Sequence, residues 1–370
     1  MVLSPHTNEN TSYEYHSLNN TTIDQPAASV SIPLCRSKPA AGHSYSLDPS
    51  KNNIAFMCLN VHGLRRKLNN IDFKNNLGKY DVLSFCETHA DDADNDFFKS
   101  VLDNLGFIVF IQNRKKLANR KSGGILVAVR KELSSYVKRL NCAEDFMVVL
   151  DIDKGLFEFD KNIIYITAYV PPPRSDYSNV DMFNSISNVI LNYDTDDYLH
   201  LLTGDLNART KNSSDLVTFD REILELLDLD EDTSVRLDIV KNFELLGLPI
   251  ERFSRDWKVD TYGRALLELC KNHMLCIFNG RTGADRNIGK VTTDGDSLID
   301  YVIGSPYLLS KVKIFRVNSF DPLFSDYHCI VEWKISSNKA AFKKTRKNST
   351  KHTKNQQSSR FWDPNKTASF

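Results

Sequence analysis

Short runs of apolar residues, many of them β-branched, alternate along the chain with polar segments, beginning near Asn53. Apolar runs of about four to eight residues that end in polar or turn-forming clusters are typical of buried β-strands. The pattern therefore predicts a protein rich in short strands. We expect strands at Ile54–Val61, Asp81–Cys86, Phe107–Ile111, Ile125–Arg130, Met147–Ile152, Ile163–Val170, Leu199–Gly204, Leu275–Asn279, Leu298–Gly304, Val312–Val317 and Cys329–Ile335.

Several segments between these strands carry apolar residues at helical spacing instead. In Val180–Asn192, for example, Phe183, Ile186 and Ile190 fall on one helical face. We expect helices at Asp94–Leu105, Val180–Asn192, Gly263–His273 and Ser305–Leu309. Many strands with scattered helices favour two packed sheets flanked by helices, which is an α/β sandwich.

Three compositional zones divide the chain, and it contains no internal repeat. Residues 1–52 are rich in Ser, Asn, Thr and Pro with few apolar anchors, which predicts a disordered segment. Residues 53–336 carry all the predicted elements and are long enough to form one domain around a two-sheet core. Within them, about 213–256 is acidic and Leu-rich with weak periodicity, so we expect an insertion on the surface. Residues 337–370 are predicted to form a linker.

The neutral net charge conceals an asymmetry. The chain has 47 basic and 47 acidic residues, but residues 339–360 carry eight Lys or Arg and no acid. The remainder holds 39 basic against 47 acidic residues and is therefore acidic. The basic segment is interpreted first as a solvated linker, and second as a tether that holds polyanions near an acidic body.

Cysteine usage and the absence of apolar spans indicate an intracellular protein. The seven cysteines are scattered, include no Cys-x-x-Cys pair, and several lie in strand-like segments. This pattern predicts free thiols in a reducing compartment and argues against a zinc or disulfide framework. No apolar run approaches the roughly 18 residues that a membrane span needs, and residues 1–20 lack the features of a signal peptide. We expect a nuclear or cytoplasmic location without membrane contact.

Two strand ends suggest a metal site. Asn60 ends the first predicted strand and Glu87 follows the second. Each is followed two residues later by a histidine, His62 and His89. Carboxylate and amide oxygens are hard ligands that suit Mg²⁺. Taken alone, a Glu at a strand end is more often a solvated loop residue.

Two further strand ends carry residues that could handle a phosphate. Gly204 breaks an apolar strand and leaves Asp205 and Asn207 two residues apart, on one side of an extended chain. Asp205 could accept a proton from an attacking water while Asn207 donates to a phosphoryl oxygen. Tyr169 ends a strand before three prolines that stiffen the following loop. The alternatives are an Asp-containing turn and a packing tyrosine.

A mid-strand carboxylate and a histidine complete the set. Asp300 lies within an apolar strand, where an unpaired carboxylate is costly. His328 is a natural partner, because a carboxylate fixes the orientation and tautomer of an imidazole. Asp326 lies close by and could add charge at the metal. The alternative is a polar strand entry with His328 as a satisfied core residue.

Together these segments resemble the endonuclease/exonuclease/phosphatase superfamily, and specifically the apurinic-type endonucleases of non-LTR retrotransposons. The resemblance covers about residues 53–335. It rests on the segments LNVHGL, CETH, SGGILVAV, AYVPPPRSDY, TGDLNAR, FSRDWKVDTYGRALLELC, GKVT, LIDYVI and SDYHCI. The segments CETH, AYVPP and TGDLNAR favour the retroelement branch.

This resemblance implies a four-layer α/β sandwich of two packed, mainly antiparallel sheets, with a Mg²⁺ ion (Mn²⁺ as a substitute) and a DNA substrate. It implies Glu87 as the main metal ligand with Asn60 and Asp326 nearby. It further implies the following catalytic residues: Asp205, which activates the attacking water, Asn207 and Tyr169, which contact the phosphate, Asp300, which orients His328, and His328 itself. Cleavage would leave 3′-OH and 5′-phosphate ends, as in the priming of reverse transcription.

The sequence departs from the family pattern in one place. Tyr327 separates Asp326 from His328, where the family usually has Asp and His adjacent. Since successive strand residues point to opposite faces, this shift would turn His328 away unless a local bulge restores its direction. No reverse transcriptase segment is recognisable, and the residues RFWDPNKTASF resemble the start of a connector, so we expect a truncated or separate reading frame.

Three hypotheses remain open at this point. The first is a Mg²⁺-dependent DNA endonuclease of a retroelement, with no obligate protein partner. The second keeps the fold but acts on abasic DNA, a phosphomonoester or a lipid. The third is a decayed or domesticated copy that binds nucleic acid without cutting it, which a displaced His328 would favour.

Overall fold

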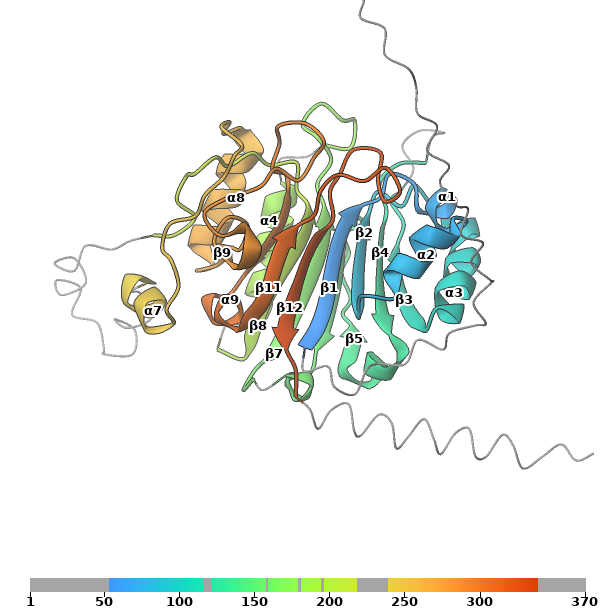
Figure 1. Cartoon of the computed structure of the whole chain (residues 1–370), viewed down its shortest axis with the longest axis horizontal. Helices are drawn as coiled ribbons and strands as arrows, with labels where there is room; N and C mark the ends of the chain where they lie inside the picture. The colour runs from blue at the N-terminus through green and yellow to red at the C-terminus, as the bar shows by residue number, and fades with distance from the viewer. Residues whose placement is uncertain are drawn as a thin grey trace, which may run out of the picture. The chain divides into compact units, whose positions relative to one another are not determined.

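The computed structural model describes residues 53–338, apart from residues 116–120, 158, 179–180, 194–195 and 218–238. The predicted disordered segment 1–52 therefore lies outside the described residues, as do residues 339–370 of the predicted linker. The described part contains two six-stranded sheets with helices on their outer faces (Figure 1). None of its helices is long and apolar enough to cross a membrane.

The first sheet has the strand order β11-β12-β1-β2-β4-β3. β1 and β2 are parallel, and the other neighbouring pairs of this sheet are antiparallel. Both faces of β1, β2 and β4 are covered, which explains their unbroken apolar sequences. The strands are β1 Asn53–Asn60, β2 Val82–Cys86, β3 Phe107–Gln112, β4 Ile125–Arg130, β11 Val312–Val317 and β12 Val331–Ser336.

The second sheet repeats this arrangement with the order β5-β6-β7-β8-β10-β9. Its central pair, β7 and β8, is parallel, and the remaining neighbours are antiparallel. Each sheet therefore has one parallel pair at its centre, and the prediction of mainly antiparallel sheets is confirmed. The strands are β5 Val137–Arg139, β6 Met147–Ile152, β7 Asn162–Tyr169, β8 Tyr198–Asp205, β9 Cys276–Ile277 and β10 Asp300–Gly304.

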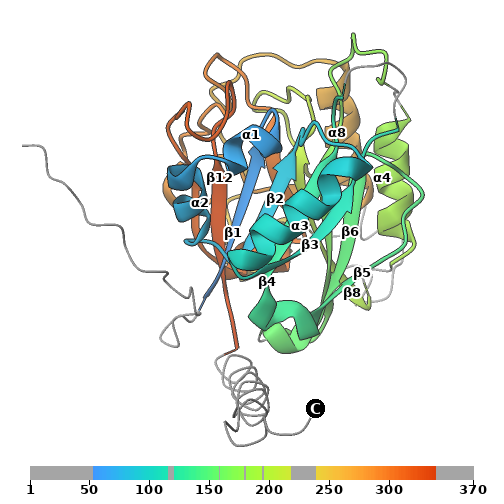
Figure 2. The same cartoon turned by 90° about the vertical axis from the view of Figure 1, so that its right-hand side faces the viewer.

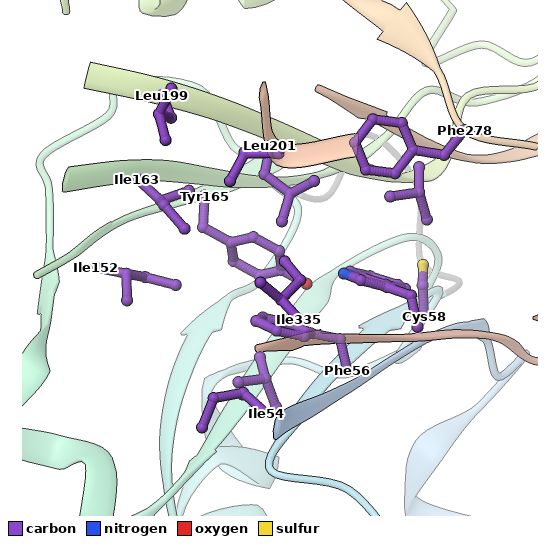
Figure 3. Close-up of a cluster of buried hydrophobic side chains, with 14 of the residues drawn as sticks. Ile54, Phe56, Cys58, Ile152, Ile163, Tyr165, Leu199, Leu201, Phe278 and Ile335 are labelled. Carbon is purple, nitrogen blue, oxygen red and sulfur yellow. The ribbon is translucent and has the colours of Figure 1, made fainter. Parts of the chain in front are cut away.

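The two sheets pack face to face over an apolar core. Figure 3 shows Phe56 and Cys58 from the first sheet facing Tyr165 and Leu201 from the second. Burial of large side chains of this kind stabilises the fold by about 1.5–3 kcal/mol each. Polar contacts also cross this core, since the Ser84 hydroxyl oxygen lies 2.8 Å from that of Tyr165 and 2.9 Å from that of Thr167. The bond to Tyr165 satisfies a buried phenol that would otherwise be costly.

Helices cover the outer face of each sheet. α1 Leu64–Leu68, α2 Ile71–Leu77 and α3 Asn95–Asn104 pack on the first sheet, as Figure 2 shows from their side. α4 Met182–Leu191 and α8 Thr261–Asn272 pack on the second sheet. The predicted four-layer α/β sandwich is therefore confirmed. The other helices among the described residues are α7 Ile239–Leu245, α9 Pro306–Lys311 and the short 3₁₀ turns η1 Asp92–Asp94, η2 Lys131–Tyr136, η3 Lys154–Leu156 and η4 Gly283–Asp285.

The ends of the predicted insertion differ from expectation. Residues 218–238 in its middle lie outside the described residues. Phe243 of α7, however, is fully buried in the core between the sheets, and Asp215 is buried in a two-bond ion pair with Arg281. Side chains at both described ends of this segment are therefore buried. A Leu-rich sequence with weak periodicity can still bury individual side chains.

Candidate active site

Five strands bring the predicted site residues together at one end of the sandwich. Asn60 ends β1 and Glu87 directly follows β2. Tyr169 ends β7 and Asp205 ends β8, while Asp300 begins the antiparallel strand β10. In the register of the second sheet, Asp205 lies opposite both Tyr169 and Asp300. The site thus follows from where the strands begin and end.

Asp205 lies at the centre of this cluster and is 1% exposed. The Asn60 side-chain amide donates to its Oδ2 atom at 2.8 Å, and the Asn207 backbone N–H donates to Oδ1 at 3.0 Å. Burial, followed by the negative charge of Asp300, raises the pKa of Asp205 to about 7 against the opposing effects of His328 and Asn60. The carboxyl group can therefore exchange a proton near neutral pH.

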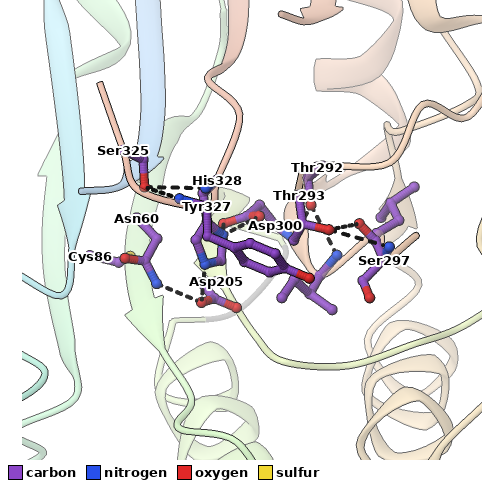
Figure 4. Close-up of polar contacts among 12 residues, drawn as sticks. Asn60, Cys86, Asp205, Thr292, Thr293, Ser297, Asp300, Ser325, Tyr327 and His328 are labelled. Atoms are coloured by element: carbon purple, nitrogen blue, oxygen red, sulfur yellow. Dashed lines mark hydrogen bonds and ion pairs between the residues drawn. The ribbon is translucent and has the colours of Figure 1, made fainter. Parts of the chain in front are cut away.

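His328 lies between two carboxylates, as Figure 4 shows. Its Nδ1 atom is 2.9 Å from Oδ2 of Asp300, and its Nε2 atom is 3.8 Å from Oδ2 of Asp205. Burial lowers the pKa of His328, but the charge and hydrogen bond of Asp300 outweigh burial and raise this pKa to about 10. The imidazole is therefore a cation at neutral pH that faces Asp205.

The extra residue Tyr327 does not turn His328 away. The Ser325 hydroxyl oxygen accepts the His328 backbone N–H at 3.2 Å, and His328 bridges to Thr293 before β12 begins at Val331. Strand alternation does not govern a residue that precedes the regular strand, so this local turn sets the direction of His328. Tyr327 instead projects outward and is 47% exposed.

Asp326 bonds side chains from the loop after β1 and from α1. Its carboxylate accepts from Lys67 Nζ at 3.0 Å and Arg66 Nη2 at 3.1 Å, and it lies 3.3 Å from His62 Nδ1. The hydrogen bond from Lys67 holds the pKa of Asp326 below its usual range. Asp326 thus contacts these three side chains. Among the described residues, it forms no bond with Glu87.

Glu87 has a left-handed backbone conformation, with φ 51°, which is uncommon for a side chain with a Cβ atom. The Tyr169 hydroxyl donates to its Oε1 atom, and His89 Nε2 lies 3.1 Å from Oε2. Burial raises the pKa of Glu87, but the hydrogen bonds from His89 and Tyr169 outweigh burial and hold it at about 2. Glu87 is therefore ionised at any physiological pH.

Asn207 also has a left-handed backbone, with φ 46°. Its side-chain amide donates to the Val170 carbonyl oxygen at 2.9 Å, and its backbone N–H reaches Asp205. In this structure Asn207 therefore holds the ends of β7 and β8 together. Asn60 is likewise engaged, since its Oδ1 atom accepts the His62 backbone N–H at 3.2 Å.

Two groups of side chains in the described residues have ligand atoms close enough to hold a metal ion. One is His62, Glu87 and His89, and the other is Asp205, Asp300 and His328. The second group is buried, and within it His328 Nδ1 lies 2.9 Å from Asp300 Oδ2. The first group is open to solvent and contains the ionised Glu87.

The sequence interpretation missed Arg114, which follows β3 and is 8% exposed. Its guanidinium carbon lies 4.9 Å from the centroid of the Tyr169 ring and 4.8 Å from that of Tyr177. Its buried Nη2 atom has no hydrogen-bond partner in the described part of the chain. A Cβ at Gly123 would lie 2.6 Å from the guanidinium carbon, so only glycine leaves room for Arg114 there. The glycines of the Ser-Gly-Gly segment were therefore the one sequence feature that could have indicated a side chain packed against this loop.

The fold and the site together define a class of hydrolases, the α/β-sandwich phosphoesterases. A sequence model of the Endonuclease/Exonuclease/phosphatase family matches residues 57–326, and the chain belongs to this family. Family members are nucleases and phosphatases that use divalent metals. No curated protein matches the chain.

Solved structures of low sequence identity resemble the chain. The AP endonuclease LMAP from Leishmania major is 14% identical, covers 78% of this chain and 89% of its own, and has a TM-score of 0.52. The endonuclease domain of TRAS1, a telomere-specific non-LTR retrotransposon, is 14% identical, covers 77% and 98%, and has a TM-score of 0.47. The 3′ phosphatase NExo from Neisseria is 14% identical, covers 76% and 99%, and has a TM-score of 0.48. At this identity the likeness shows the fold alone.

Proposed function

We propose that the protein is a divalent-metal-dependent phosphodiesterase that nicks DNA and leaves a 3′-OH, as in retrotransposon target-site cleavage. The observation that carries the proposal is the position of Asp205, which is buried between Asn60 and the cationic His328. A carboxyl group whose pKa is about 7, beside a fixed cation, suits a reaction in which water loses a proton while a phosphate gains charge.

The side chains have distinct roles in this reaction. Asp205 takes a proton from water as the water oxygen bonds to phosphorus, and the bond from phosphorus to the 3′ oxygen breaks. His328, held by Asp300, donates a hydrogen bond to the charged phosphoryl oxygens in the transition state. The departing 3′ oxygen takes up a proton from solvent water and becomes the 3′-OH, while the phosphate stays on the 5′ end.

The residues present fit a magnesium ion. Glu87 supplies a carboxylate that stays ionised, and Asn60 supplies an amide at the end of the adjacent strand β1. Mg²⁺ typically binds through one or two carboxylates and keeps several waters, and Mn²⁺ takes the same ligands. When bound, the ion supplies charge that neutralises the phosphoryl and leaving oxygens.

Two considerations support DNA as the substrate. Beside Tyr169, Arg114 has an N–H without a hydrogen-bond partner among the described residues, and guanidinium groups bind phosphates well. The chain also shares its fold with a structure described as an AP endonuclease. The retrotransposon assignment rests on the resemblance of CETH, AYVPP and TGDLNAR to that branch.

The test is nicking of supercoiled plasmid by the full chain in Mg²⁺, with Glu87→Gln and Asp205→Asn as variants. We expect both to lose at least about 100-fold in rate, since each removes a charge that the reaction uses. Asp103→Asn, in an exposed ion pair with Lys131, is the matched control and should keep full rate. Extension of the nicks by a DNA polymerase reports the 3′-OH.

The same assay separates the alternatives. Equal cleavage of undamaged and abasic duplexes supports the proposed function, whereas a strong preference for abasic sites indicates a repair enzyme. DNA binding without turnover in Mg²⁺ or Mn²⁺ indicates a non-cutting remnant. Activity that survives either Glu87→Gln or Asp205→Asn contradicts the roles assigned to these residues.

A further inference from the structure

His62, Glu87 and His89 form a cluster at the open side of the site. Their ligand atoms all lie within 4.8 Å of one another, and His89 Nε2 is 3.1 Å from Glu87 Oε2. The side chains of His62, Glu87 and His89 are 46%, 17% and 21% exposed, so an ion from solvent can reach them. They come from two loops, one after β1 and one after β2.

The backbone of these loops is held in an uncommon conformation at each of the three residues. The φ angles are 45° at His62, 51° at Glu87 and 50° at His89. A positive φ costs free energy for residues other than glycine, and such residues gather at functional sites. Backbone hydrogen bonds fix both loops, since Gly63 N–H donates to the Glu87 carbonyl at 2.9 Å and His89 N–H donates to the Gly123 carbonyl at 2.9 Å. The cluster is therefore built before any ion arrives.

His62 has an outer partner of the kind that orients metal-binding histidines. Its Nδ1 atom lies 3.3 Å from Asp326 Oδ2, which leaves Nε2 for an ion. A carboxylate behind a ligating imidazole fixes the ring and strengthens the ligand. Asp326 is fixed in turn by Lys67 and Arg66.

A cavity of about 530 Å³ adjoins the two histidines of the cluster. His62, His89 and Asp326 line it together with Thr88 and Arg66. Hydrated ions can therefore reach the two histidines from solvent.

We propose that His62, Glu87 and His89 bind a borderline divalent transition-metal ion such as Zn²⁺ or Co²⁺. Two imidazole nitrogens and one carboxylate, with a position left open, suit these ions better than Mg²⁺, which prefers oxygen ligands. The site shares Glu87 with the candidate Mg²⁺ site, so the two ions exclude each other. One consequence rests on the proposed function: because bound Zn²⁺ occupies Glu87, it inhibits Mg²⁺-dependent nicking.

The test uses the full chain, stripped of metal and free of DNA. Zn²⁺ binding is measured by calorimetry, and Co²⁺ binding by the visible absorption that imidazole-ligated Co²⁺ shows. Asp326→Asn should weaken Zn²⁺ binding about 10- to 100-fold, as loss of an outer partner does. His62→Asn and His89→Asn each remove a ligand and should weaken binding at least as much. His273→Asn is the matched control, because His273 lies elsewhere and bonds Ser187.

Each result decides for or against the site. Loss of the Co²⁺ absorption in His62→Asn/His89→Asn, with retention in His273→Asn and an unchanged unfolding midpoint, supports it. Unchanged Co²⁺ affinity in that double variant overturns the proposed site. A loss of Co²⁺ absorption that occurs only in Asp300→Asn also overturns it, because the ion would then lie in the buried group of Asp205, Asp300 and His328. The binding assay contains no DNA, so it tests the Zn²⁺ site independently of nicking. If the chain binds Zn²⁺ in this assay but does not nick plasmid in Mg²⁺, only the proposed function is contradicted.

Discussion

The Nε2 atom of His328 lies 3.8 Å from Oδ2 of Asp205, while the Nδ1 atom of the same ring faces Asp300 at 2.9 Å. One cation thus lies between two buried carboxylates. The charge of Asp300 raises the pKa of His328 and also that of Asp205. Asp300 therefore keeps His328 protonated and, at the same time, makes Asp205 a stronger proton acceptor.

The first prediction concerns this coupling. Asp300→Asn should lower the nicking rate about 100-fold or more, because His328 loses both its orientation and part of its charge. His328→Gln should have a similar effect, and the double variant should be little worse than either single variant. A double-mutant cycle on the nicking rate measures this non-additivity.

Thermal unfolding of the same variants provides the control. All three should unfold cooperatively, so that their rates report on chemistry and not on a loss of folded protein. Fully additive effects of Asp300→Asn and His328→Gln would mean that Asp300 does not act through His328.

The second prediction concerns Arg114 as a phosphate-binding residue. Arg114→Ala should weaken DNA binding and reduce the slope of log K against log salt by about one unit, as expected for the loss of one phosphate contact. Arg114→Lys should recover only part of the affinity, since lysine neither stacks between Tyr169 and Tyr177 nor offers a planar pair of donors.

Lys138→Ala, on an exposed position of β5, is the matched loss of one positive charge. Binding is measured by titration of a fluorescent duplex at several salt concentrations. An unchanged salt slope in Arg114→Ala, or an equal change in Lys138→Ala, would remove Arg114 from the phosphate contacts.

The fold was predictable where the apolar pattern was strong. β1, β2 and β4 are buried on both faces, so unbroken apolar runs marked them. α1 and α2 were missed because they are only five and seven residues long and largely polar. β9 is confined to Cys276–Ile277, although the strand was expected over Leu275–Asn279. Its ends are set by the length of pairing with β10, which the local sequence does not encode.

The site was predictable as a set of residues but not in its contacts. Asp300 and His328 do pair, as the cost of an unpaired buried carboxylate predicted. The direction of Asp326 was not predictable, because it depends on Lys67 and Arg66 from a helix far away in the sequence. Arg114 was missed for the same reason, since its partners Tyr169 and Tyr177 lie on another sheet and loop.

The third prediction concerns the buried ion pair of Asp215 and Arg281. Two bonds of 2.7 Å join their side chains, which are 1% and 0% exposed. Asp215→Asn should lower the free energy of unfolding by about 3–5 kcal/mol, because Arg281 is left as an uncompensated buried charge. Asp103→Asn, which breaks an exposed pair with Lys131, should cost about 1 kcal/mol or less. Unfolding in urea measures both.

The same pair predicts a dependence on pH. Burial raises the pKa of Asp215, but the hydrogen bond and charge of Arg281 outweigh burial and lower it below its usual value. Since the folded pKa lies below the unfolded pKa of about 3.9, this stabilisation is complete above pH ~4 and is lost as the pH falls through the folded pKa. The stability difference between wild type and Asp215→Asn should therefore shrink only below pH ~4. A difference that shrinks near neutral pH would contradict this sign.

The last prediction concerns Gly204, which directly precedes Asp205 in β8. Its φ is 145°, and a Cβ there would lie 1.8 Å from the Ala168 carbonyl oxygen of the neighbouring strand β7. Gly204→Ala must therefore push β7 and β8 apart, and we expect a loss of at least about 3 kcal/mol in the free energy of unfolding, together with lower nicking activity. Gly247→Ala is the matched control, because Gly247 also has a positive φ, 64°, but an added Cβ would meet nothing within 4 Å. It should cost only the backbone strain, about 1 kcal/mol. Equal losses in the two variants, measured by urea unfolding, would mean that the approach of β7 to β8 does not constrain the position of Asp205.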